Sequence, residues 1–249
     1  MTLSRPCFIF AAGTYYGNEP STSQLPDDAF IIAADGGLDR TRDLGIRPDL
    51  VIGDFDSAKA EIPRDVETIA LPPEHDDPDM LSALKTGWSR GYRDFHIYGG
   101  LGGRIDHTVA NIQMLALLAH NGGVGLLYGE HSVVTAICNG SLSFVSDVLE
   151  DNATNRMVSV FSHADTSRGI NETGLKYELK DGIMHSDTVL GVSNEFLAGH
   201  PASISVSDGT LIVTFPLEAT LPTFKTSVKA PETLGPLSSH VSALLNKSR

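Results

Sequence analysis

Short continuous apolar runs alternate with helical periodicity over the first half of the chain. The apolar runs cover residues 7–11, 30–34, 50–52, 68–71, 95–98 and 124–128. Helices are predicted at 38–44, 79–90 and 105–119, where Ile105, Val109 and Ile112 begin a repeat of spacings of four and three. Such alternation is typical of a parallel sheet with both faces covered. The pattern predicts an α/β domain with a mainly parallel, Rossmann-like sheet over residues 1–131.

The second half shows a different pattern of short alternating runs. These runs cover residues 133–137, 142–145, 157–161, 175–179, 202–206 and 211–215, with turn signals at 139–140, 180–182 and 207–209. The pattern predicts an all-β, sandwich-like domain over residues 132–216. We expect the polar segment 191–196 to be a loop between strands. Residues 217–249 are predicted to be a tail without an assigned role, with a weak helix at 241–245.

Acidic residues and glycines follow several predicted strands of the first half. They are Asp35, Gly36 and Gly37 after 30–34, Asp54 and Asp56 after 50–52, and the acidic loop Asp76–Asp79 after 68–71. Because parallel strands end at one edge of a sheet, we expect a single acidic, glycine-lined crevice there. Crowded carboxylates favour a bound cation, and oxygen ligands suit Mg²⁺, which bridges to substrate phosphates. The competing interpretation of Asp54-x-Asp56 is a capped turn beside a solvated carboxylate.

Two further segments carry candidate chemistry at the starts of helices. The glycines at 99–103 precede the helix at 105 and let backbone N–H groups approach a phosphate, although they match neither a Walker A loop nor a dinucleotide fingerprint. Arg104 offers a guanidinium fork for phosphate oxygens, or else forms a surface ion pair with a neighbouring Asp. In the acidic loop, Asp77 is predicted to be the N-cap and Pro78 the first residue of the following helix.

Composition narrows the class of partner. The net charge of -13 argues against nucleic acid or an anionic membrane as the main partner, but not against ATP bound through Mg²⁺. The two cysteines, Cys7 and Cys138, are too few for a disulfide framework. We see no signal peptide and no apolar stretch long enough to span a bilayer. These features predict a cytoplasmic protein.

Taken together, the motifs resemble those of the thiamine pyrophosphokinase family. The similarity runs from about residue 7 to 215. The matching residues are Ala34–Gly37, Arg47–Asp49 with Gly53–Ser57, Asp76 with Asp79, Gly102–His107 with Asn111, and Gly191–Phe196. Two positions depart from the family pattern: Pro78 stands where the family often has Thr, and Leu81 stands where it often has a polar residue.

The resemblance implies an activity and roles for these residues. The N-terminal domain would bind ATP and the C-terminal domain thiamine, in a homodimer with sites shared between chains, and the reaction would yield thiamine diphosphate and AMP. The implied metal ligands for Mg²⁺ are Asp54, Asp56 and Asp79, with Arg104 and Asp106 also catalytic. The implied ATP-binding residues are Asp35, Gly36, Gly37, Gly102, Gly103, Arg104 and Asn111, and those for thiamine are Asp79, Ser193 and Asn194. Asp76 would support the metal site from outside, and Asp79 or Asp106 would accept the hydroxyl proton.

Three alternatives remain at this point. A pyrophosphokinase for another small alcohol, such as a hydroxymethylpterin, would carry the same metal and ATP apparatus, although Ser193 and Asn194 favour thiamine. A phosphatase of the haloacid dehalogenase type would also place Asp54-x-Asp56 after a strand, but the chain lacks a recognisable later Lys motif. A non-catalytic thiamine- or ATP-binding protein is disfavoured by the intact carboxylates and by Arg104.

Overall fold

The computed structural model describes residues 5–55, 61–74, 76–150, 153–238 and 240–241. These residues form two compact units. We call the described residues of Thr2–Thr108 and Pro231–Arg249 the parallel unit, and those of Val109–Ala230 the β unit. The division falls inside helix α3 (Ile105–His120), whereas the sequence pattern places the start of the second domain at residue 132.

The parallel unit is built on five strands in the order β5-β1-β2-β3-β4. All four neighbouring pairs are parallel, as predicted. The strands are β1 (Pro6–Phe10), β2 (Phe30–Ala34), β3 (Leu50–Gly53), β4 (Glu67–Ala70) and β5 (Asp94–Tyr98). In β1, β2 and β3, side chains such as Ile9, Ile32 and Leu50 are fully buried, which explains why these three runs carry no polar alternation. The edge strand β4 is mostly exposed.

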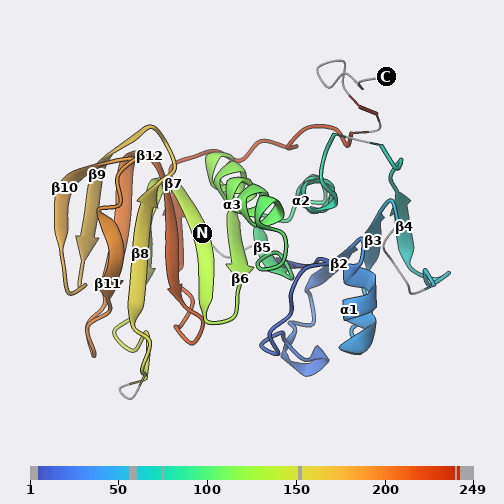
Figure 1. Cartoon of the computed structure of the whole chain (residues 1–249), viewed down its shortest axis with the longest axis horizontal. Coiled ribbons are helices and arrows are strands. Elements are labelled where there is room, and N and C mark those ends of the chain that lie inside the picture. Colours follow the sequence, from blue (N-terminus) through green and yellow to red (C-terminus); the bar gives the residue numbers. More distant parts are fainter. Residues whose placement is uncertain (1–4, 56–60, 75, 151–152, 239, 242–249) are drawn as a thin grey trace. The chain divides into compact units, whose positions relative to one another are not determined.

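Two helices pack against this sheet. Helix α1 (Gly37–Asp43) contacts β1 and β2, while α2 (Asp79–Ser89) contacts β2 and β3. Figure 1 shows α1 and α2 on opposite faces of the sheet. A short 3-10 helix, η1 (Thr22–Gln24), precedes β2. The connections from β2 through α1 to β3, and from β4 through α2 to β5, carry the chain back to the same edge of the sheet.

The β unit is antiparallel throughout its described strands. These are β6 (Val124–Tyr128), β7 (Ser132–Phe144), β8 (Met157–Ser162), β9 (Thr166–Thr173), β10 (Leu179–His185), β11 (Gly191–Glu195), β12 (Ala202–Pro216) and β13 (Thr223–Thr226). The long strands β7 and β12 pair with each other along most of their length. The ring of Phe144, in β7, packs edge to face with the rings of Phe196 and Phe215.

Two predicted hairpin turns are instead facing irregularities within β7 and β12. The pairing slips between Val206 and Thr210, opposite Asn139. Asn139 adopts a φ of 44°, and its side-chain Oδ1 accepts a hydrogen bond from the Gly209 N–H at 3.0 Å. Asn tolerates this left-handed conformation, and its amide replaces a ladder bond. The turn residues therefore kink continuous strands, which merges two pairs of predicted strands into one each.

The polar segment 191–196 was predicted to be a loop, and this prediction is wrong. Residues Gly191–Glu195 form β11, an edge strand that pairs with β8. A Cβ at Gly191 would lie 2.3 Å from the Val160 carbonyl oxygen, so the strands approach closely there. An edge strand needs only one buried face and accepts polar residues on the other.

Other parts of the β unit also differ from the sequence pattern. Residues 175–178 are not a strand, because Leu175 forms only an isolated bridge, with Phe196, and β10 begins at Leu179. The expected turn at 180–182 lies inside β10, where the pairing is irregular. Strand β13 lies in the predicted tail, whereas most of the predicted helix at 241–245 is outside the described residues.

No helix in the described part of the chain combines the length and apolarity that a membrane crossing requires. Cys7 and Cys138 are both free thiols.

Candidate active site

Two carboxylates are brought together by the pairing of β2 with β3. Ala34 lies opposite Ile52 in this parallel pair, so both strands end at the same level. The Asp35 N–H donates a hydrogen bond to the Ile52 carbonyl oxygen at 2.8 Å. A Cβ at Gly53 would lie 3.0 Å from the Asp35 Cα, so a glycine is needed for this approach. The local sequence thus places Asp35 beside Asp54.

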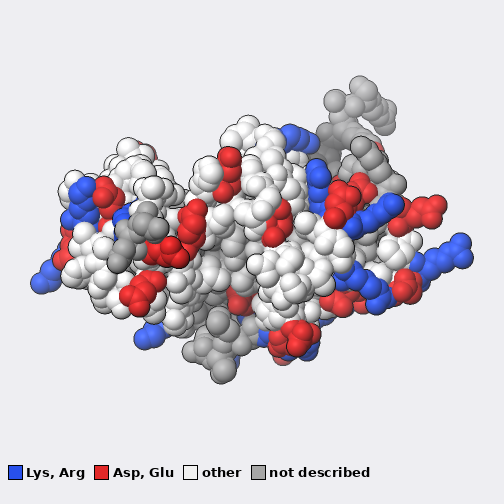
Figure 2. All heavy atoms as spheres, turned by 90° about the horizontal axis from the view of Figure 1, so that it is seen from below, with Lys and Arg blue, Asp and Glu red and all other residues white. Residues whose placement is uncertain are grey.

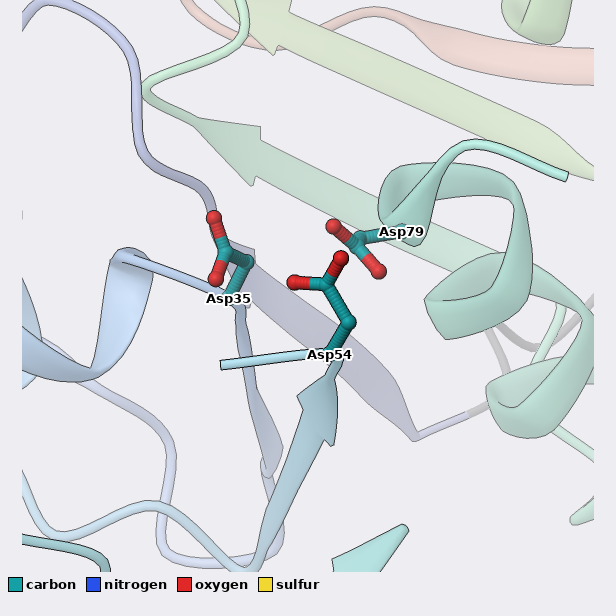
Figure 3. A group of neighbouring side chains, drawn as sticks. All are labelled: Asp35, Asp54 and Asp79. Atoms are coloured by element: carbon teal, nitrogen blue, oxygen red, sulfur yellow. The ribbon is translucent and has the colours of Figure 1, made fainter. Parts of the chain in front are cut away.

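The third carboxylate comes from the first residue of α2. One carboxylate oxygen from each of Asp35, Asp54 and Asp79 lies within 4.8 Å of the others. Figure 3 shows the three side chains pointing toward one another from the ends of β2 and β3 and the start of α2. All three are half-buried, and the Oδ1 atoms of Asp35 and Asp79 are shielded from solvent. We call these three residues the acidic cluster.

Three carboxylates at this separation repel one another where solvent screening is weak, and a cation relieves the repulsion. The ligand atoms on offer are all carboxylate oxygens, which suits Mg²⁺, Mn²⁺ or Ca²⁺ better than softer metals. The donor set and its partial burial therefore fit the Mg²⁺ that the sequence predicted.

The membership of this cluster differs from the predicted metal site. Asp54 and Asp79 lie together, but the third member is Asp35, for which the family resemblance implied ATP binding. Asp56, predicted as a ligand, lies outside the described residues. Asp76 is exposed and is not a member of the acidic cluster. The signal for Asp35 in the sequence is its position directly after a predicted strand, which places it at the same sheet edge as Asp54 without fixing their distance.

Asp77 does not cap α2, which corrects the prediction for this helix. The N-cap is Pro78, which makes no side-chain cap hydrogen bond, and the helix begins at Asp79. The Asp77 Oδ2 atom instead lies 2.6 Å from Lys85 Nζ and accepts a hydrogen bond from the Ser238 N–H at 3.2 Å. The Asp77 carboxylate therefore holds Lys85 and Ser238 instead of the first turn of the helix.

Arg104 and Asp106 form an ion pair with each other at the start of α3. The Arg104 Nη2 atom lies 2.6 Å from Asp106 Oδ2, and Nε lies 3.2 Å from Oδ1. Both side chains are mostly exposed, at 74% and 62%. The hydrogen bonds from Arg104 lower the pKa of Asp106, and the same contact raises the pKa of Arg104. The geometry matches the surface ion pair that the sequence left open, and the exposed guanidinium remains accessible to a phosphate.

The predicted ATP-binding glycines have packing constraints of their own. A Cβ at Gly37 would lie 1.9 Å from the Phe10 carbonyl oxygen, so α1 packs directly on β1. At Gly102, which has a φ of +78°, a Cβ would lie 2.3 Å from the Tyr16 hydroxyl. Gly103 also has a positive φ, and it is exposed. Gly36 is the N-cap of α1. Close packing is therefore sufficient to explain the glycines at Gly37 and Gly102, independently of any phosphate binding.

Asn194 is buried and makes four hydrogen bonds within the β unit. Its Nδ2 donates to Glu172 Oε2 at 3.1 Å and to the Tyr177 carbonyl oxygen at 2.7 Å. Its Oδ1 accepts from the N–H groups of Tyr177 at 3.0 Å and Glu195 at 2.9 Å. A side-chain amide has two donor and two acceptor positions, so internal partners use all of them. Burial raises the pKa of Glu172, which is only 2% exposed, and the bond from Asn194 partly offsets this effect.

Ser193, the neighbouring candidate, is exposed and has a φ of 61°. Its N–H donates to Ser159 Oγ at 3.0 Å, and its side chain faces solvent. Asn111, a predicted ATP-binding residue, is buried on α3 within the β unit. The sequence did not predict a role for Glu172 or Tyr177, because their hydrogen bonds to Asn194 join segments that are separated in the chain.

Acidic and basic side chains are mixed on the molecular surface. Figure 2 shows one face, on which many Lys and Arg side chains of the described residues lie beside Asp and Glu side chains. On this face the described residues form no continuous basic surface of the kind that contacts nucleic-acid phosphates.

Comparisons with known proteins agree on one family. A model described as "Thiamin pyrophosphokinase, catalytic domain" matches residues 22–124. A second, described as "Thiamin pyrophosphokinase, vitamin B1 binding domain", matches residues 147–211. The first match includes the acidic cluster, Arg104 and Asp106, whereas the second includes Ser193 and Asn194.

Individual relatives are distant but extensive. A thiamine pyrophosphokinase of Bacillus subtilis is 26% identical over 77% of this chain and 89% of its own length. Thiamin pyrophosphokinase 1 of Caenorhabditis elegans is 23% identical over 59% of this chain, and the match spans only 62% of that relative. The crystal structure of the B. subtilis protein superposes with a TM-score of 0.73 at 23% identity, covering 85% of this chain and 99% of that one. The thiamin pyrophosphokinase from Candida albicans gives 0.69 at 14% identity, covering 85% and 88%.

Proposed function

We propose that this chain, which belongs to the thiamin pyrophosphokinase family, transfers pyrophosphate from ATP to the hydroxyl of thiamine and releases AMP. The observation that carries the proposal is the acidic cluster, because it lies at the strand ends inside the region matched to the catalytic domain. The presence of a matched vitamin B1 binding region disfavours a hydroxymethylpterin or another alcohol as the acceptor. We further propose that the parallel unit is Rossmann-like, that the β unit is sandwich-like, and that the functional boundary lies near residue 131.

We assign the metal to the acidic cluster. Asp35, Asp54 and Asp79 would hold Mg²⁺, with Asp56 as a further predicted ligand. When bound, Mg²⁺ would supply Lewis-acid neutralisation of the charge on the phosphate oxygens. The chain contributes the fixed carboxylates, and their partial burial keeps this interaction strong.

We assign ATP binding to the loops around this cluster. Arg104 would exchange its contact with Asp106 for bidentate bonds to phosphate oxygens. The main-chain N–H groups near Gly36, Gly37, Gly102 and Gly103 would donate to the same phosphates. Asn111 remains a predicted contact to ATP.

The chemical step joins the thiamine hydroxyl oxygen to the β-phosphorus and breaks the bond from that phosphorus to the oxygen that AMP retains. The hydroxyl proton passes to a carboxylate. The two candidate acceptors are Asp79, in the acidic cluster, and Asp106, which is released when Arg104 turns to the phosphates.

We assign thiamine contact to Ser193 and support of that contact to Asn194. The exposed hydroxyl of Ser193 is available to a ligand, whereas the amide of Asn194 is engaged internally. We also propose a cytoplasmic homodimer in which Ser193 and Asn194 of one chain serve the acidic cluster of the other. Sedimentation of the purified protein tests the dimer, and a monomer that retains full activity would contradict it.

The experiment that tests the proposed activity identifies the nucleotide product. The protein is incubated with Mg-ATP and either thiamine or a hydroxymethylpterin. We expect AMP and thiamine diphosphate in equal amounts with thiamine only. Formation of ADP or free phosphate, or turnover with the pterin alone, would contradict the proposal.

A further inference from the structure

The C-terminal segment 231–238, which we call the C-terminal strap, lies along α2 within the parallel unit (Figure 1). It lies outside both family-matched regions, the second of which ends at residue 211. The Pro231 carbonyl oxygen accepts hydrogen bonds from Trp88 Nε1 at 3.0 Å and Arg93 Nη2 at 3.2 Å. Further along, the Pro236 carbonyl oxygen accepts one from Lys85 Nζ at 2.9 Å. The strap is therefore attached to α2 and the loop after it at two separate places.

The far end of the strap holds the acidic loop that precedes α2. Ser238 Oγ accepts a hydrogen bond from the Asp76 N–H at 3.1 Å. The Ser238 N–H donates to Asp77 Oδ2, the same oxygen that lies 2.6 Å from Lys85 Nζ. The Lys85 and Asp77 side chains are each only 13% exposed, so solvent and salt screen their attraction weakly. The strap, the helix and the acidic loop thus meet at one carboxylate oxygen.

A single residue separates this junction from the acidic cluster. Pro78, with a φ of -56°, joins Asp77 to Asp79, and its ring fixes that angle. The Pro78 carbonyl oxygen accepts the helical hydrogen bond from the Ser82 N–H at 3.1 Å. With this φ fixed, fewer main-chain rotations can absorb a change in the position of Asp77 before it reaches Asp79.

We propose that the C-terminal strap is a positioning element for metal binding, in which Ser238 fixes residues 76–77 and thereby keeps the Asp79 carboxylate in reach of Asp35 and Asp54. This inference rests on the proposed function, since it takes the acidic cluster to be the metal site. Ser238 acts through Asp77 and Pro78 and touches no substrate.

The test is a titration of the full-length, substrate-free protein with Mn²⁺, followed by electron paramagnetic resonance of free and bound metal. Ser238→Pro removes both the hydroxyl and the N–H donor, Ser238→Ala removes only the hydroxyl, and Ser238→Thr keeps both. Residues that hydrogen-bond a metal ligand directly typically change metal affinity by about 10- to 100-fold. Ser238 acts one step further away, through Asp77 and Pro78, so we expect a loss at the lower end of this range, about tenfold, for Ser238→Pro. A smaller loss, of about two- to tenfold, is expected for Ser238→Ala, and none for Ser238→Thr.

Thr233→Ala is the matched control. Its hydroxyl accepts a hydrogen bond from one N–H and donates to one carbonyl, as that of Ser238 does, but both groups belong to Gly235 within the strap. We expect this variant to bind Mn²⁺ like the wild type. Thermal unfolding is followed for every variant, and Ser238→Ala, with its main chain unchanged, carries the test if Ser238→Pro does not fold.

Wild-type affinity in folded Ser238→Pro and Ser238→Ala would overturn the proposal, as would an equal loss in Thr233→Ala. Loss of affinity in Ser238→Thr equal to that in Ser238→Ala would also overturn it. The wild type's nucleotide product is measured separately. AMP formation with unchanged Mn²⁺ affinity in the folded Ser238 variants contradicts the strap alone, whereas tight Mn²⁺ binding without AMP formation contradicts the proposed activity alone. A wild type that does not bind Mn²⁺ contradicts both the metal site and the strap.

Discussion

The sequence pointed to polar residues both in the acidic cluster and in the Ser193–Asn194 pair. In the structure, the side chains of the acidic cluster converge on one another, whereas those of the pair do not share a site. At the parallel strand ends, three carboxylates converge with oxygens within 4.8 Å, an arrangement that suits a cation and carries an electrostatic cost to the fold without one. In the β unit, Asn194 faces inward and has its hydrogen-bonding positions filled by its own chain. Adjacent polar residues in a strand point to opposite faces, so only one of such a pair is presented to a ligand.

We expect the largest effect from a substitution in the acidic cluster. Asp54→Asn removes one charge from the acidic cluster without changing side-chain size, and turnover should fall by about a hundredfold or more, since charge stabilisation of the transition state is lost. Steady-state kinetics at limiting Mg²⁺ measures the effect, with circular dichroism to follow folding. Asp43→Asn is the control, because Asp43 forms only an exposed ion pair with Arg40. Near-normal turnover in Asp54→Asn would separate Asp54 from the metal site.

The Ser193–Asn194 pair is tested by replacing each of its members. Asn194→Ala removes four hydrogen bonds and leaves buried partners unsatisfied, so the free energy of unfolding should fall by about 2–4 kcal/mol. Ser193→Ala removes an exposed hydroxyl and should instead raise the KM for thiamine with little change in stability. Chemical denaturation and steady-state kinetics on both variants measure these effects. The reverse pattern, with a stable Asn194→Ala and a destabilised Ser193→Ala, would refute the assignment.

Arg104→Lys tests whether the exposed ion pair has a ligand-binding role. The substitution keeps the charge but loses the planar fork, so we expect the KM for ATP to rise by about tenfold. Stability should be unchanged, since exposed pairs contribute little. The measurement is ATP titration at saturating thiamine. Kinetics equal to those of the wild type would leave Arg104 as a surface ion-pair residue only.

The smallest effect concerns the pH dependence of the β unit. The folded-state pKa of Glu172 is raised, so the folded state holds this proton more tightly than the unfolded state. Stability from this group is present below the ordinary Glu pKa and is lost as pH rises through the raised value. Glu172→Gln keeps an acceptor for Asn194 without the charge. The free energy of unfolding of this variant should therefore fall less steeply with rising pH than that of the wild type. Denaturation across this pH range measures the difference, and an equally steep decline in the variant would contradict the account.

The strands of the parallel unit were predictable because their apolar runs are continuous and their ends carry the polar residues. Asp54 was singled out because it follows such a run and Asp79 because it closes the acidic loop after another, and the structure brings both into the acidic cluster. Asp35 was recognised as a site residue but not as a member of the acidic cluster, since that depends on the register between β2 and β3.

The β unit was harder to predict because its turn-forming residues also serve inside strands. Asn139 and Gly209 read as hairpin turns in sequence, yet they form facing kinks stabilised by a side-chain hydrogen bond. The role of Asp77 was missed for a related reason, since its partner Ser238 is 161 residues away in the chain. Local spacing carries no information about such contacts.

The central claim is that Asp35, Asp54 and Asp79 form one cation site, and Asp35→Asn tests it most directly because the family resemblance implied ATP binding, not metal binding, for this residue. Calorimetric titration of the substrate-free protein with Mn²⁺ should give one tight site per chain in the wild type. In Asp35→Asn the affinity should fall by about tenfold or more, because a charged ligand becomes neutral. Asp39→Asn, in the first turn of α1, should leave it unchanged. Wild-type affinity in folded Asp35→Asn would contradict the account.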